Sequence, residues 1–111
     1  MKMNDAPFPD LTLAASRFAA LGSEQRLTVL STLVRAGPDG LTIGDLGNRS
    51  GVTGSTLTHH MKILASAGLV TQARQGRQII CAAVAYEDLR ALSNFLLREC
   101  CADARPPLER P

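Results

Sequence analysis

Residues 41–70 read LTIGDLGNRSGVTGSTLTHHMKILASAGLV and carry the clearest local structure signals in the chain. It contains two helix-start signals of the same kind. Thr42 and Thr53 are good N-cap residues, and each has apolar residues at the two positions that form a hydrophobic staple. A glycine follows each expected helix. Two short helices joined by a tight glycine-containing turn form a helix-turn-helix, which we place over residues 42–67.

The second of these helices, expected over residues 54–67, has an apolar side and a polar side. Its apolar residues recur at helical spacing and should face the core. The polar side is short-chained and free of acids, and such a helix fits the major groove of DNA. The alternative is an ordinary solvated face. We predict that this region contacts DNA through Thr53, Ser55, Thr56, Thr58, His59 and Lys62.

His60 lies at the edge of the apolar stripe of the same helix. We therefore expect it to be packed and hydrogen bonded rather than in contact with a base.

Two strand-like runs follow, at residues 69–75 and 77–84, around Gly76. A glycine-centred turn between such runs predicts a β-hairpin. Arg74 and Arg77 flank the glycine, and a basic tip beside a groove-binding helix can enter the adjacent minor groove, where arginine is favoured. The alternative for this pair is two solvated arginines.

The rest of the chain completes one domain. Helical periodicity predicts helices at residues 10–21, 24–36 and 86–101. We expect a flexible arm over residues 1–9 and a disordered, proline-containing tail over residues 102–111. The predicted fold is mainly α with a small β-hairpin: a winged helix-turn-helix domain over residues 10–101, with about five helices, a helix-turn-helix at 42–67, a wing at 69–84 and a last helix at 86–101.

Charge is unevenly distributed along the 111 residues, whose formal net charge is +2. Residues 46–86 contain no Asp or Glu, yet they carry Arg49, Lys62, Arg74 and Arg77 and both histidines. This positive zone favours a nucleic-acid partner. No apolar run reaches the length of a membrane span and no signal peptide is evident, so we expect a cytoplasmic protein with no membrane partner. No catalytic motif points to an enzyme.

The runs LGSEQRLTVLSTLVRAG, LTIGDLGNRSGVTGSTLTHHMKILASAGLV and QGRQIICAAV resemble the ArsR/SmtB family of metal- and stress-sensing repressors. The most specific part is similar to the family pattern Ser-x-x-Ser-x-His-Leu-x-x-Leu-x-x-Ala-Gly-Leu, with Thr58 and Met61 as substitutions. The resemblance implies a homodimer, joined by the first and last helices, that binds palindromic operator DNA until an inducer weakens the complex. The dimer-interface residues that it implies are Phe18, Leu89, Leu92 and Leu96.

The inducer site is not one of the family's common ones. The Cys-x-Cys pair of its arsenite sensors corresponds to Thr42 and Gly44, and the predicted last helix has no histidine for a zinc site. The thiols that remain are those of Cys81, Cys100 and Cys101. If the last helix folds back along the strand, Cys81 can face Cys100; a site built across the dimer is equally open.

Soft thiolates select thiophilic ions. Three thiolates suit trivalent arsenic or antimony, and two suffice for a monosubstituted trivalent organoarsenical, whose carbon group takes the third position. The resemblance to arsenic-responsive repressors supports arsenic as the metal. The alternatives are another soft metal, a redox or persulfide switch, cysteines that only pack in the core, and a winged-helix module that binds protein.

Overall fold

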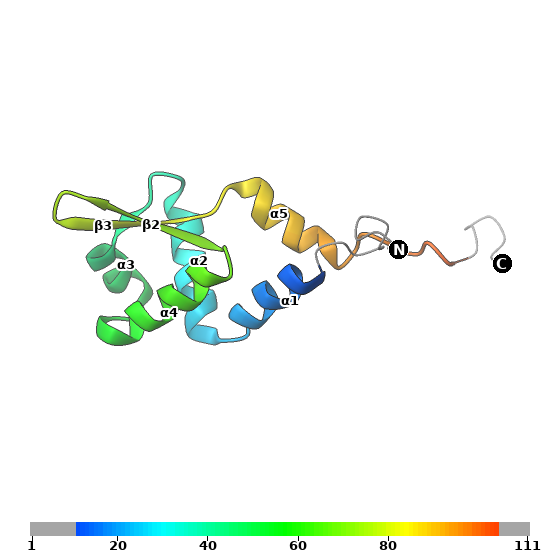
Figure 1. The fold of residues 1–111 in the computed structure, drawn as a ribbon, viewed down its shortest axis with the longest axis horizontal. Coiled ribbons are helices and arrows are strands. Elements are labelled where there is room, and N and C mark those ends of the chain that lie inside the picture. The colour runs from blue at the N-terminus through cyan, green and yellow to red at the C-terminus, as the bar shows by residue number, and fades with distance from the viewer. Residues whose placement is uncertain (1–10, 105–111) are drawn as a thin grey trace.

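The computed structural model describes residues 11–104 of the chain, so the predicted arm and most of the predicted tail lie outside the described residues. The structure is a helical body from which a long β-hairpin projects (Figure 1). The elements are α1 (Leu11–Ala20), α2 (Glu24–Ala36), β1 (Leu41–Thr42), α3 (Ile43–Ser50), α4 (Gly54–Ser66), β2 (Val70–Gln75), β3 (Gln78–Ala83) and α5 (Tyr86–Phe95).

The expected helix-turn-helix is present as α3 and α4. The hydroxyl of Thr42 accepts a hydrogen bond from the backbone N–H of Asp45 at 3.1 Å, which caps α3. Gly51 ends α3 with a left-handed backbone, φ 78°, and its N–H donates to the carbonyl of Gly47. Thr53 begins α4 from an extended backbone but makes no side-chain cap bond. The end of α3 at Ser50 and the start of α4 at Gly54 leave only a three-residue turn between the two helices.

The sheet has three strands in the order β1-β3-β2, all antiparallel to their neighbours. The hairpin was expected, whereas β1 was not, because two residues are too few to show a strand pattern. Leu41 pairs with Cys81. Gly40 makes this approach possible: its φ is +75°, and a Cβ there would overlap the carbonyl oxygen of Cys81.

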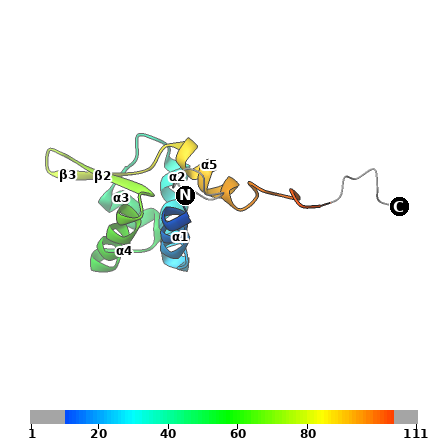
Figure 2. The same cartoon turned by 45° about the vertical axis from the view of Figure 1, so that its right-hand side comes forward.

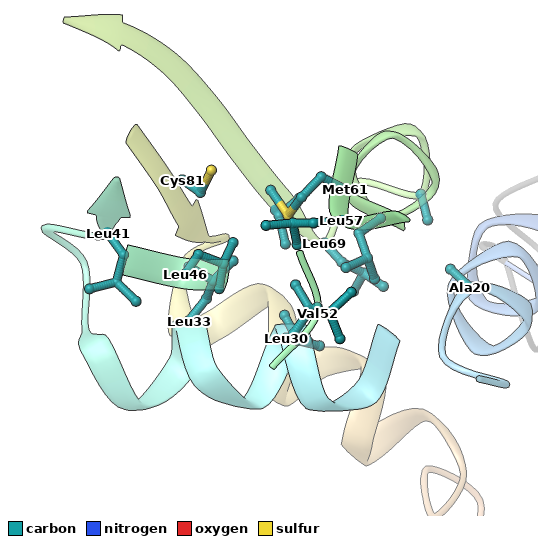
Figure 3. Close-up of a cluster of buried hydrophobic side chains, with 14 of the residues drawn as sticks. Ala20, Leu30, Leu33, Leu41, Leu46, Val52, Leu57, Met61, Leu69 and Cys81 are labelled. Carbon is teal, nitrogen blue, oxygen red and sulfur yellow. The ribbon is translucent and has the colours of Figure 1, made fainter. Parts of the chain in front are cut away.

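The core lies between α2, α3, α4 and the sheet, where Leu33, Leu46, Met61 and Leu69 are fully buried (Figure 3). Cys81 lies in the same cluster. On α4 the face that fills the core is the one that the apolar spacing predicted for residues 54–67. On α2 the core is filled by Val29, Leu30 and Leu33, whereas Leu27 and Val34, which helical spacing places on the same apolar stripe as Leu30, are 47% and 50% exposed. Burial of such large side chains is the main favourable term in a domain of this size.

The last helix is shorter than predicted. It ends at Phe95, not at residue 101, and single turns with i→i+3 hydrogen bonds follow it, such as Cys100 N–H to the Leu97 carbonyl at 2.9 Å. Leu96 and Leu97 are 70% and 68% exposed, so this segment has little apolar packing within its own chain. Short helices without tertiary packing are marginal. Among the described residues, no helix has the length and apolarity that a bilayer crossing requires.

Candidate nucleic-acid interface

The outward side of α4 is the polar face that its sequence predicts. Leu57, Met61 and Leu64 are buried beneath it and hold the helix against the core. The six side chains predicted to contact DNA in and just before this helix are all exposed: Thr53, Ser55, Thr56, Thr58, His59 and Lys62. The hydroxyl of Thr58 donates to the carbonyl of Gly54 at 3.4 Å and stays on the surface.

The hairpin extends from the body as a wing (Figures 1 and 2). β2 and β3 pair as far as Gln75 and Gln78, which leaves a two-residue turn of Gly76 and Arg77. Gly76 takes φ +62°, the conformation that a type II′ hairpin turn needs at its first position. Arg74 and Arg77 are both exposed. The wing tip therefore carries two positive charges in a part of the chain without acids.

His60 is held on the inward side of α4, as the sequence predicted. Its side chain is 8% exposed. Nη1 of Arg26 on α2 lies 3.2 Å from Nδ1, and Nε2 lies 2.7 Å from Oε1 of Gln25. Burial, then the nearby charge of Arg26 and that of His59, hold the pKa of His60 below its ordinary value. His60 is thus part of the scaffold beneath the polar face.

The comparisons with known proteins agree on this architecture. A family model described as a helix-turn-helix domain matches residues 21–73. The chain is 32% identical over 68 residues to YceK of Bacillus subtilis (strain 168), an uncharacterized HTH-type transcriptional regulator; the match covers 61% of this chain and 67% of YceK. An ArsR-like transcriptional regulator from Rhodococcus sp. RHA1 superposes with a TM-score of 0.67 at 29% identity, covering 83% of this chain and 82% of that one.

The chain belongs to the ArsR family of winged helix-turn-helix transcriptional regulators. A further structural match is a homodimeric winged helix-turn-helix DNA-binding domain from Mycobacterium bovis, a possible ArsR-family regulator. It has a TM-score of 0.63 at 25% identity and covers 84% of this chain and 81% of the other.

This ArsR-family chain exposes apolar side chains on α1 and just beyond α5. Of the residues implied for a dimer interface, Leu92 is buried in the subunit's own core, while Phe18 and Leu89 are half-buried against it. Leu96 is exposed. Leu11 is also exposed, although helical periodicity places it on the apolar stripe of the first predicted helix. The sequence pattern did not single out Leu13 and Leu97, which are exposed as well and lie off the predicted stripes.

The three cysteines of this ArsR-family chain lie in two places. Cys81 is fully buried on β3, and burial raises the pKa of its thiol. Cys100 and Cys101 are exposed, with their Sγ atoms 3.3 Å apart. β3 and the turns beyond α5 lie toward opposite ends of the molecule (Figures 1 and 2).

The fold-back arrangement, with Cys81 facing Cys100 in one subunit, is absent from the structure. Within residues 11–104, no group of three His, Cys, Asp or Glu side chains is placed to hold a metal ion. The physical reason is the early end of α5, which runs along α1 rather than back along the wing. A thiol site built across two subunits stays a prediction.

Proposed function

We propose that this chain is a homodimeric transcriptional repressor that binds operator DNA through α4 and the wing and leaves it when a trivalent arsenical binds cysteine thiolates. The observation that carries the DNA-binding part is the acid-free surface made by His59 and Lys62 on α4 and by Arg74 and Arg77 on the wing. Such a surface attracts phosphates, and its short polar side chains leave room for the helix in the major groove.

The homodimer is supported by the exposed leucines of α1 and of the segment beyond α5, a surface that a second copy would cover. Leu11, Leu96 and Leu97 are 55%, 70% and 68% exposed. Removing apolar surface from water contributes about 25 cal/mol per Å². The M. bovis domain, which is homodimeric, gives independent support. A dimer would present two copies of α4 to half-sites about one DNA turn apart.

The inducer site that the geometry favours is the vicinal pair Cys100 and Cys101. Both thiols are exposed, and their sulfurs are 3.3 Å apart, close enough for one atom to bridge them. A monosubstituted dihydroxyarsine, R–As(OH)₂, would condense with the two thiols to form two As–S bonds and release two waters. Arsenic stays trivalent and keeps its carbon group. Inorganic arsenite or antimonite needs a third ligand, which Cys81 would supply only across a dimer.

A salt titration tests DNA binding. The probe is a duplex from the protein's own promoter, and the readout is fluorescence anisotropy at several salt concentrations. We expect a steep slope of log K against log salt, reduced by about two units each in Lys62→Gln and Arg74→Gln, because each substitution removes one phosphate contact from both subunits of the dimer. Arg90→Gln is the matched control, because Arg90 is an exposed arginine of α5 stacked over Tyr86. A shallow slope would instead favour a protein-binding winged-helix module.

Release of the same duplex tests the inducer. Methylated trivalent arsenic, arsenite, antimonite, cadmium and peroxide are each added to the bound wild type. Cys100→Ser and Cys101→Ser should bind DNA as the wild type does but resist release by the methylated arsenical. Resistance in Cys81→Ser as well would place Cys81 in a site across the dimer. Undiminished release of the double Cys100→Ser, Cys101→Ser variant would overturn this thiol site, and release by peroxide alone would favour the redox alternative.

A further inference from the structure

One guanidinium joins three helices beneath the DNA-binding face. Nε of Arg26, on α2, donates to the carbonyl of Ala20, where α1 ends. Nη1 of the same side chain is 3.2 Å from Nδ1 of His60, on α4. On the other side of the imidazole, Nε2 of His60 is 2.7 Å from Oε1 of Gln25, again on α2. The imidazole of His60 therefore links α4 to α2 directly and, through Arg26, to the end of α1.

The bonds specify a single protonation state for His60. A guanidinium has only donors, so Nδ1 must keep its lone pair to accept from Arg26. The amide oxygen of Gln25 has only lone pairs, so Nε2 must carry the hydrogen. The bonded form is the neutral imidazole with its proton on Nε2, as assigned from this network.

A second proton would break the network. It would place an N–H on Nδ1 directly against the N–H of Arg26 and set a positive charge beside the guanidinium. The charged or titratable groups that act on His60 are Arg26 from α2 and His59 on α4 itself. α1 contributes its terminal carbonyl at Ala20, and its Arg17 bonds the carbonyl of Ala67 instead. Residues 46–86, which supply α4 and β2, contain no carboxylate to stabilise an imidazolium.

We propose that Arg26 and His60 are positioning residues for the DNA-binding helix. We call the hydrogen bonds that join Gln25, Arg26 and His60 the brace, and we propose that mild acid breaks the brace and weakens operator binding. The proposal rests on the DNA-binding function proposed above. Operator DNA is expected to bind the braced arrangement, so the apparent affinity is the intrinsic affinity multiplied by the fraction of molecules that remain braced. The lowered pKa of His60 agrees with this arrangement, because the same contacts disfavour the protonated form.

The first test is the pH profile of operator affinity at constant ionic strength, from about pH 8 to pH 5.5, for wild type, His60→Asn and His59→Asn. Wild-type affinity should fall as the pH drops through the lowered pKa of His60, by at most about tenfold per pH unit for each subunit of the bound dimer, the limit for one linked proton per subunit. Asparagine offers a neutral acceptor near the Nδ1 position, so His60→Asn should lose this fall. His59→Asn, the adjacent exposed histidine, should keep it. Parallel profiles for wild type and His60→Asn would overturn the proposal.

A second measurement does not depend on DNA. ¹⁵N NMR of the wild-type imidazoles should show His60 unprotonated at Nδ1 and protonated at Nε2 near pH 7.5. It should also show a lower pKa for His60 than for an unperturbed histidine. The opposite tautomer would overturn the brace even if DNA binds well. Absence of DNA binding at about pH 7.5 with the expected tautomer would instead contradict the proposed function. Circular dichroism at each pH confirms that the protein compared is folded.

Discussion

Nε of Arg17 on α1 donates to the carbonyl oxygen of Ala67, at the end of α4, over 3.0 Å. The last carbonyls of a helix have no partner within the helix, so an external donor satisfies one of them. The arginine also lies against Gly68, where a Cβ would be 3.0 Å from Nη2. The end of α4 is thereby tied to the helix that carries the exposed Leu11 and Leu13.

Loss of this tie should destabilise the protein modestly. Arg17→Met keeps much of the apolar stem but removes the donor, and we expect the free energy of unfolding to fall by about 1 kcal/mol. Urea denaturation measures the change. Arg35→Met is the control, because Arg35 is an exposed arginine of α2. Equal losses in the two variants would contradict a structural role for the bond.

Gly40 and Gly51 form a matched pair for testing how β1 is held. Both have left-handed backbones, with φ +75° and +78°, but an added Cβ overlaps the Cys81 carbonyl only at Gly40. Gly51→Ala should cost about 1–2 kcal/mol of unfolding free energy for the backbone alone. Gly40→Ala should cost more, because β1 must also separate from β3. Similar urea midpoints for the two variants would show that the close approach of Gly40 to the Cys81 carbonyl does not affect stability.

His60 should make stability depend on pH. Its folded-state pKa lies below the unfolded value of about 6.5, so the unfolded chain binds a proton first as the pH falls. The free energy of unfolding should therefore decrease from about pH 6.5 downward and level off below the folded-state pKa. Above about pH 6.5 the group contributes no pH dependence. Urea denaturation of wild type and His60→Asn across this range isolates the effect, and a constant difference between them would contradict it.

The three thiols should differ in reactivity. Cys100 and Cys101 are exposed, whereas Cys81 is fully buried and its pKa is raised by that burial. Because the thiolate is the reactive species, iodoacetamide should modify two thiols per native chain and the third only in denaturant. Mass spectrometry of peptides from timed samples gives the three rates. Labelling of Cys81 at the rate of Cys100 in the folded protein would contradict the structure.

Local sequence patterns predicted the DNA-binding elements well. Thr42 and Thr53 begin α3 and α4 as predicted, although only Thr42 makes a side-chain cap bond, and the strand-like runs around Gly76 form the wing. These features depend on neighbours within a few residues. β1 was missed because its strand character comes from pairing with β3, forty residues away in the chain.

The amino-acid order alone determined the polar face of α4, the inward position of His60 and the acid-free segment around the wing, because helix periodicity and side-chain charge are local properties. Three other features follow from the folded arrangement: α5 ends at Phe95, Cys81 lies in the core while the other two thiols are exposed, and Arg26 links Ala20 to His60. Those outcomes depend on which surfaces meet after folding. A helix continues only where packing supports it. The acceptors of the Arg26 guanidinium come within hydrogen-bond distance only once the separate helices have packed together.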